Sequence, residues 1–190
     1  MMRVAVLAVQ GAFIEHERML TGLGATVFEI RKKTDLEQDF DALVLPGGES
    51  TVMGKLLREL DLLEPLRKKI KSGMPVLATC AGLILLAEHI SNDENVYFGT
   101  MPVTVKRNAY GRQLGSFEVE MEVKHVGKVP LRFIRAPFIE AAGEGVEILA
   151  KVDENIVAAQ FRNQIALAFH PELTQSTDIH KYFLEHLTRA

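Results

Sequence analysis

The single cysteine of the chain, Cys80, lies where a short apolar run meets a longer one with helical character, in PVLATCAGLILLAEH (residues 75–89). Its neighbours at minus two and plus two, Ala78 and Gly82, are small, as a sharp strand-to-helix turn around a nucleophile requires. Unpaired N–H groups at such a turn favour a thiolate and can bind an oxyanion. A lone cysteine among Val, Leu and Ala is, however, usually a buried apolar side chain. This stretch alone slightly favours the buried interpretation.

A second candidate pair is His170 and Glu172 in AFHPEL. In extended backbone, residues two apart point to the same side, and Pro171 biases His170 away from helix. His170 is then a candidate general base for Cys80, and Glu172 the carboxylate that orients its ring. The alternative is a strand end followed by an acidic helix start, and HPE alone is a weak match.

A third candidate is the turn in LPGGEST (residues 45–51), which follows an apolar run. Gly47 and Gly48 permit dihedral angles that other residues avoid, and their N–H groups can bind an anion by donating hydrogen bonds to it. The turn is equally consistent with a strand-to-helix connection capped by Ser50 or Thr51. Both interpretations can hold together.

The elements around these residues alternate in the first half of the chain, which predicts a parallel sheet with helices on both faces. In the first predicted helix, Ile14, Met19 and Leu20 are expected to point inward. The expected strands are Val4–Val9, Ala25–Ile30, Asp41–Gly48 and Met74–Cys80. The expected helices are Ala12–Leu23, Thr51–Lys71 with a break or restart at Pro65, and Ala81–His89.

The second half favours short strands and hairpins between polar breaks. They fall in residues 96–138, including Tyr110–Val123, and in residues 144–172, and an amphipathic helix is expected over Gln175–Leu187. No linker or repeat is evident, so residues 1–190 are expected to form a single domain. In an open parallel sheet, ligands bind outside the carboxyl ends of the strands. The glycine turn, Cys80 and His170 all follow apolar strands, so they are expected at one edge.

The composition of the chain argues against several classes of protein, including nucleic-acid-binding, disulfide-bonded and membrane-spanning proteins. The chain has 190 residues, 47% of them hydrophobic and 25% charged, with a net charge of -3, which disfavours a nucleic-acid partner. One cysteine cannot form an internal disulfide, and no apolar run approaches the roughly 18 residues of a membrane helix, so a cytoplasmic protein is expected. Neither a metal nor a cofactor is expected, because five histidines show no ligand-like pairing: His16, His89, His125, His180 and His186.

The motifs LPGGEST, TCAGLILLA and HPELT, in this order and spacing, resemble class I (triad) glutamine amidotransferases. The set is most similar to the glutaminase subunits of pyridoxal 5'-phosphate synthase, the PdxT/SNO family. Further similar stretches are VAVLAVQGAFIEH, RNAYGRQLGSFE and FIRAPFI, so the resemblance extends over most of the chain. It implies a three-layer, flavodoxin-like α/β fold with a mostly parallel sheet and antiparallel strands in the second half.

The resemblance also implies a catalytic or binding role for each of several residues. Cys80 would attack the side-chain amide of L-glutamine, His170 would transfer the protons, and Glu172 would orient His170. Backbone N–H groups of Gly48 and Ala81 would form the oxyanion hole. Residues implied to bind the substrate are Gly48, Glu49, Ser50, Arg107, Ile134 and Arg135.

The released ammonia implies a protein partner, since a chain of this length has no room for a second synthase domain. The resemblance identifies the partner as the subunit that builds pyridoxal 5'-phosphate. The expected docking face includes Gln10, Gly11 and Gly47. Competing interpretations are a glutaminase subunit of another biosynthetic pathway, a Cys hydrolase or chaperone of the DJ-1/PfpI type, and a binding module with an inert cysteine.

Overall fold

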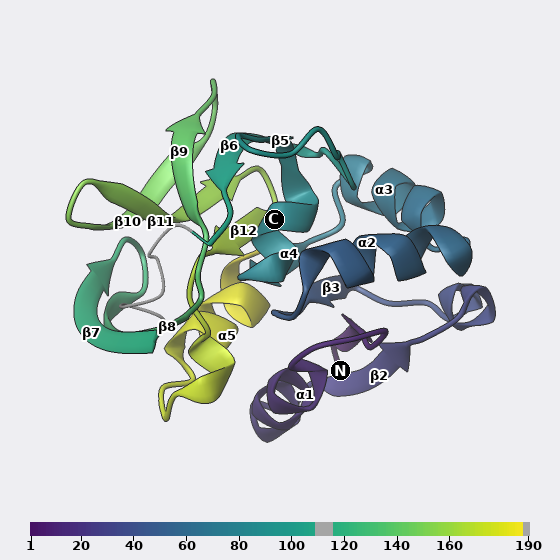
Figure 1. Cartoon of the computed structure of the whole chain (residues 1–190). Coiled ribbons are helices and arrows are strands. Elements are labelled where there is room, and N and C mark those ends of the chain that lie inside the picture. The colour runs from purple at the N-terminus through teal and green to yellow at the C-terminus, as the bar shows by residue number, and fades with distance from the viewer. Residues whose placement is uncertain (109–115, 188–190) are drawn as a thin grey trace.

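A mixed sheet forms the centre of the molecule in this computed structural model, which describes residues 1–108 and 116–187 (Figure 1). The strand order is β2-β1-β3-β4-β12-β11-β9-β6-β5, and β10 pairs with β11. The strands of this sheet are β1 (Arg3–Leu7), β2 (Thr26–Ile30), β3 (Ala42–Leu45), β4 (Val76–Thr79), β5 (Ala87–Ile90), β6 (Met101–Lys106), β9 (Phe138–Ala142), β10 (Glu147–Val152), β11 (Asn155–Phe161) and β12 (Gln164–Leu167).

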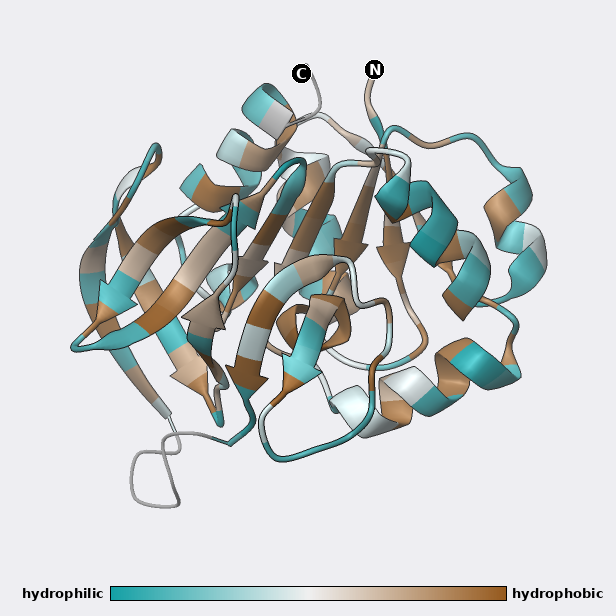
Figure 2. Cartoon of the chain, turned by 90° about the horizontal axis from the view of Figure 1, so that it is seen from above, coloured by the Kyte–Doolittle hydropathy of each residue, from teal (hydrophilic) through white to brown (hydrophobic). Residues whose placement is uncertain are grey.

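The half of the sheet from β2 to β12 is parallel, as the alternating pattern predicts. Every residue of β3, β4 and β12 is buried, because helices cover both faces. Apolar strands therefore lie inside, with polar surfaces on the outer helices (Figure 2). From β11 to β6 the pairing becomes antiparallel, which confirms the expected change of character in the second half.

Helices form two layers around this sheet. One side carries α1 (Phe13–Gly22) and α5 (Asp178–Tyr182), and the other carries α2 (Ser50–Glu59), α3 (Leu63–Lys71) and α4 (Ala81–Leu86) (Figure 1). Shorter turns complete the chain: η1 (Lys33–Glu37), η2 (Pro171–Leu173) and η3 (Phe183–Leu187).

A separate antiparallel hairpin pairs β7 (Ser116–Val123) with β8 (Gly127–Ile134). Phe133 on β8 stacks on Phe117 with ring centroids 4.6 Å apart and meets Phe169 edge-on at 5.8 Å. Because Phe169 immediately precedes His170, this aromatic packing places the hairpin beside the end of β12. The first residues of the predicted Tyr110–Val123 region lie outside the described residues.

The structure corrects several sequence predictions at element ends. Leu20 is buried in α1 as predicted, but Ile14 is 46% exposed, and the second buried position of the helix is His16 rather than Ile14 or Met19. The break or restart expected near Pro65 is present: the Thr51–Lys71 region is two helices, and Pro65 lies in the first turn of the second, where a missing N–H costs nothing.

Two further helices differ from their predicted lengths. The helix after Cys80 ends at Leu86, and the chain then forms β5 rather than continuing to His89. The C-terminal helix begins at Asp178 and becomes a π-type turn from Phe183. Among the described helices, none is long and apolar enough to cross a membrane.

Candidate active site

Four neighbouring parallel strands bring the candidate residues to one edge of the sheet. In spatial order these strands are β1, β3, β4 and β12, and their carboxyl ends lead to Gln10, Gly47, Cys80 and His170. Segments from opposite ends of the chain therefore meet at this edge. The convergence expected from the strand ends is present in the structure.

Cys80 occupies a strained turn between β4 and α4. Its φ of 49° and ψ of −101° lie in a region that side-chain-bearing residues rarely adopt. The Cys80 N–H donates to the Leu167 carbonyl at 2.8 Å, which anchors the turn to β12. A Cβ at Gly82 would lie 2.2 Å from the Leu45 carbonyl oxygen, so only glycine fits there. The helix that follows has only six residues, so its dipole is smaller than the sequence interpretation assumed.

His170 and Glu172 form a buried hydrogen-bonded pair. His170 Nδ1 lies 2.7 Å from Glu172 Oε1, and the two residues are 6% and 5% exposed. The contact arises differently from the sequence interpretation, because Pro171 begins a tight 3-10 turn rather than stiffening extended backbone. The His170 N–H donates to the Arg132 carbonyl at 2.8 Å, which ties this turn to β8.

The charges of this pair favour an imidazolium beside a carboxylate. Burial opposes a charge on His170, but hydrogen bonds with Cys80 and Glu172 prevail and raise its pKa to about 10. Burial alone would raise the pKa of Glu172, but its contacts with His16 and His170 hold it below its ordinary value. His170 is therefore placed to give a proton to a leaving group.

The glycine turn after β3 faces this pair directly. A Cβ at Gly47 would lie 2.3 Å from His170 Cε1 and 3.4 Å from Cys80 Cβ, so glycine here permits close approach. Neither Gly47 nor Gly48 has a positive φ, so the unusual dihedral angles expected of both are absent from this conformation. The Gly47 carbonyl accepts from the Ala12 N–H at 2.9 Å. A trans peptide then points the Gly48 N–H away from Ala12.

Glu49 caps α2, in place of the predicted Ser50 or Thr51. Its side chain accepts from the Val52 N–H at 2.9 Å, and its own N–H donates to Gln10 Oε1 at 2.8 Å. Arg107 contacts the Glu49 carboxylate at 3.2 Å and Asp93 at 3.0 Å. The segment around Glu49 is thus held from β1 and from the end of β6.

A pocket of about 470 Å³ opens between these segments. Most of the predicted residues line it: Gln10, Gly47, Gly48, Glu49, Ser50, Cys80, Arg107, Ile134, Arg135 and His170. Three predicted residues are not among those that line it: Gly11, which is exposed, and Ala81 and Glu172, which are buried. Further lining residues, which the sequence analysis did not single out, are Ala12, Ile84, Asn108 and Pro137. Within the described chain, no group of three or more His, Cys, Asp or Glu side chains is placed to hold a metal ion.

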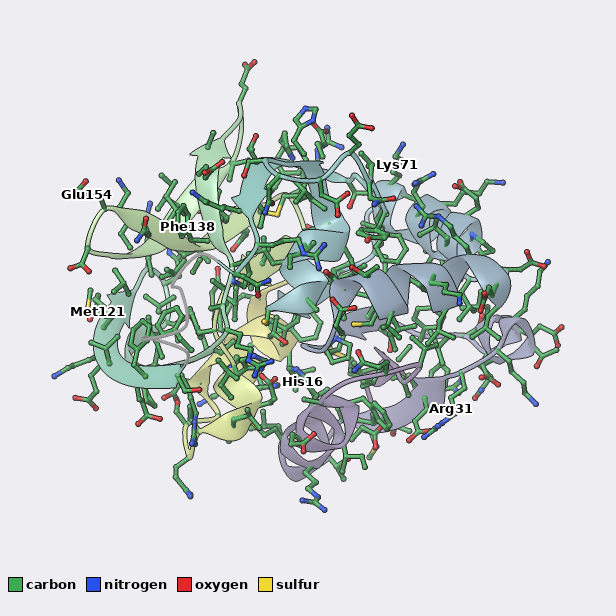
Figure 3. All side chains as sticks on the ribbon, viewed as in Figure 1. His16, Arg31, Lys71, Met121, Phe138 and Glu154 are labelled. Carbon is green, nitrogen blue, oxygen red and sulfur yellow. The ribbon has the colours of Figure 1, made fainter. Side chains whose placement is uncertain are left out.

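His16 is a further residue near the site that was not predicted from the sequence. This side chain is fully buried behind the pocket, where its Nε2 lies 3.5 Å from Glu172 Oε2 (Figure 3). The available signal was the spacing of His16 and Leu20, which places both on one face of a helix. In the sequence, His16 was grouped with the four other histidines that show no metal-ligand spacing, and its place on the buried face of the helix was not used.

The raised pKa of His170 predicts its titration. In wild type, the His170 ring signal in ¹³C NMR should remain that of an imidazolium at pH 8 and change near pH 10. In Cys80→Ala the transition should move to lower pH, because a partner that favours the charged form is lost. Folding favours this proton, so its stabilising contribution is complete below about pH 6.5 and disappears as pH rises through about 10. A wild-type transition near 6.5 would contradict this assignment.

The fold and the site together define a protein of the class I glutamine amidotransferase type. The chain belongs to the SNO glutamine amidotransferase family, whose family model matches residues 6–189. This match confirms the family expected from the three motifs. It favours an amidotransferase over a DJ-1/PfpI-type hydrolase or a non-catalytic module.

Similar proteins extend over nearly the whole chain. A protein of Desulfitobacterium hafniense strain Y51, named pyridoxal 5'-phosphate synthase subunit PdxT, is 63% identical over 98% of this chain and 94% of the relative. A protein of the same name from Streptococcus pneumoniae strain CGSP14 is 54% identical over 97% and 96%.

Solved structures agree with the fold. A crystal structure of a glutamine amidotransferase superposes with a TM-score of 0.92 at 44% identity and covers 98% of this chain and 99% of its own. A structure of PurLQS from Thermotoga maritima has a TM-score of 0.71 at 16% identity over 98% of this chain and 99% of its own, which shows a shared fold alone.

Proposed function

We propose that this chain is the glutamine-hydrolysing subunit of a pyridoxal 5'-phosphate synthase and supplies ammonia to the synthase subunit. One observation carries the chemistry: Cys80, at a strained turn, shares a pocket with His170, whose ring is hydrogen-bonded to buried Glu172. The names of the 54% and 63% identical relatives support the pathway. Residues 1–190 would act as one glutaminase domain, located in the cytoplasm.

The reaction begins with the Cys80 thiolate, which attacks the side-chain amide carbon of L-glutamine. N–H groups of Gly48 and Ala81 stabilise the oxyanion that forms on the amide oxygen. His170 gives its proton to the nitrogen as the C–N bond breaks, and this releases ammonia and leaves a cysteinyl thioester. His170 then takes a proton from water, which attacks the thioester carbon, and glutamate leaves as the Cys80 thiolate is restored.

The pocket offers a place for both charges of the amino acid. Arg107 can pair with the α-carboxylate of glutamine, since a guanidinium binds a carboxylate in a two-point contact. Glu49 can accept the α-ammonium group. The two side chains contact each other at 3.2 Å here, so substrate would replace one ion pair by two. Ile134 and Arg135 line the opposite wall, where Arg135 has a positive φ of 45°.

The docking face is expected where the site meets the N-terminal segment. Gly11 has a φ of 100°, and a Cβ there would lie 1.9 Å from the Gly47 carbonyl oxygen. Gln10 holds the Glu49 N–H. A partner that displaces Gln10 or Gly11 would therefore act on the Gly47–Gly48 peptide directly. Rotation of this peptide would aim or withdraw the Gly48 N–H, which gives a physical route to activation on binding.

The decisive test measures glutamate release from glutamine with and without candidate synthase subunits. We expect the pyridoxal 5'-phosphate synthase subunit to increase the rate, and synthase subunits of histidine or purine biosynthesis to leave it unchanged. Stimulation by one of those other subunits instead would contradict the proposed pathway while leaving the amidase chemistry intact.

The same assay tests the docking face. Gln10→Ala should reduce the partner-stimulated rate, because it removes the acceptor of the Glu49 N–H and changes the proposed contact surface. Gln175→Ala, at an exposed glutamine outside the pocket lining, is the control for the substitution type and should behave as wild type. Unchanged stimulation of Gln10→Ala would remove Gln10 from the proposed interface.

A further inference from the structure

His16 links three parts of the molecule behind the active site. It extends inward from α1 and has no exposed surface, whereas labelled side chains such as Arg31 and Lys71 lie at the periphery (Figure 3). Its Nδ1 lies 2.8 Å from His180 Nε2 on α5, and its Nε2 lies 3.2 Å from Thr79 Oγ1 at the end of β4. The same Nε2 is 3.5 Å from Glu172 Oε2.

Both rings of this histidine pair are held neutral by their surroundings. Burial lowers the pKa of His16, and the nearby charge of Glu172 only partly offsets it. Burial also holds the pKa of His180 well below its ordinary value. The groups around His16 that carry or can carry charge are Glu172 and His170 at the active site, His180 on α5 and Glu15 on α1. A neutral His16 has one N–H, so its tautomer decides what it presents to Glu172.

The hydrogen-bond partners select the tautomer with the proton on Nε2. A proton on His16 Nδ1 would require His180 to accept at Nε2 and carry its own proton on Nδ1. No acceptor among the described residues is bonded to His180 Nδ1, so that proton would be a buried, unpaired donor. The same tautomer would also aim the His16 Nε2 lone pair at the Glu172 carboxylate. With the proton on Nε2, both conflicts disappear, and the N–H faces Thr79 Oγ1 at 3.2 Å and Glu172 Oε2 at 3.5 Å.

We propose that neutral His16 is a positioning residue, whose Nε2–H holds the second oxygen of the Glu172 carboxylate and thereby fixes the orientation of His170. This inference rests on the proposed glutamine hydrolysis. Glu172 Oε1 is bonded to His170, whereas Oε2 is buried and has no hydrogen-bond partner among the described residues in this conformation. His16 Nε2 faces Oε2 at 3.5 Å, so a small shift of the ring toward the carboxylate would complete the contact. Without the His16 N–H, Oε2 would be an uncompensated buried charge, and the carboxylate would be free to rotate.

The contacts of His16 also connect it to the two turns that form the active site. Thr79 immediately precedes Cys80, and Ala12, one helical turn before His16, binds the Gly47 carbonyl. The residue that orients Glu172 is therefore connected to the cysteine turn and to the glycine turn. A displacement of α1 would therefore move the Glu172 contact, the cysteine turn and the glycine turn together.

Two substitutions at His16 separate positioning from packing. His16→Leu fills the space without an N–H, and we expect kcat for partner-stimulated glutamine hydrolysis to fall about 10- to 100-fold, with KM within about 2-fold of wild type. His16→Gln restores an amide N–H near the place of Nε2, and its kcat should lie closer to wild type than to His16→Leu. Equal kcat values for the two variants would overturn the proposal.

Two NMR measurements test the same contact without reference to activity. In ¹⁵N-histidine-labelled wild type at pH 7, His16 should be the neutral tautomer with its proton on Nε2. An imidazolium or an Nδ1–H tautomer would overturn the proposal even if His16→Leu does not fold. The Glu172 carboxyl carbon should titrate at higher pH in His16→Leu than in wild type and move back in His16→Gln. An unchanged titration in His16→Leu would show that His16 does not act on this carboxylate.

A matched pair at His180 provides the control for tautomer selection. His180→Gln keeps a donor toward His16 Nδ1, whereas His180→Phe keeps the ring volume and removes the donor. We expect the Nε2–H tautomer of His16 to persist in His180→Gln and to lose its dominance in His180→Phe, with a parallel loss of kcat. Dominance of Nε2–H in both variants, with equal kcat, would remove His180 from the arrangement.

Discussion

Glutamate release by Cys80→Ala, measured with the synthase subunit present, is expected to fall at least about 10⁴-fold below wild type. The reason is the loss of the only atom in the pocket able to form the thioester, since the chain contains no other cysteine. The side chain is small and 7% exposed, so its removal leaves the surrounding helices in place. Activity above this limit would exclude Cys80 as the nucleophile.

The stability of Cys80 variants provides an internal control for the strained turn. Because the backbone at Cys80 has a φ of 49° and a ψ of −101°, glycine relieves strain that alanine retains. Cys80→Gly should have a free energy of unfolding about 1 kcal/mol higher than that of Cys80→Ala, as measured by denaturant titration. Both variants are expected to be inactive. Equal stability of the two variants would show that the turn is not strained in solution.

Much of the active edge could be predicted because it depends on local chemistry. The apolar runs of β1, β3 and β4 are long enough to identify buried strands. Parallel pairing then places the residues after those strands at one edge, whatever their separation in the chain. Cys80 and Gly47 were found in this way: each has an ordinary structural explanation when taken alone, and only their convergence with His170 at one edge of the sheet favoured an active site.

Other features depend on packing that a single sequence does not reveal. Leu20 of α1 was predicted correctly, but Ile14 is apolar yet exposed, and a buried position belongs instead to His16, whose partners come from α5 and η2. The end of α4 at Leu86 was missed because the apolar run continues, and only the pairing of β5 with β6 selects strand there. The 3-10 turn at Pro171 was missed because a proline restricts the residue before it and leaves the conformation of the residues after it open.

Gly47→Ala is expected to lower kcat strongly by displacing the His170 ring. Its Cβ would lie 2.3 Å from His170 Cε1 and 2.9 Å from His170 Nδ1, well inside van der Waals contact. The ring must move by about 1 Å, and a displacement of that size in a reacting group lowers kcat about 100-fold. The φ of Gly47 is not positive, so an alanine is tolerated by the backbone itself and the fold should persist.

Two other glycines make this prediction specific. Gly48→Ala would contact mainly Gln10 Oε1, the end of a flexible side chain, so its effect should be smaller than that of Gly47→Ala. Gly22→Ala, at the end of α1, has no neighbour within 4 Å of the added carbon and should retain wild-type kcat. Stopped assays of glutamate release, with circular dichroism to verify folding, measure all three. If Gly47→Ala retained kcat within about 3-fold of wild type, His170 would not be held against this glycine during the reaction.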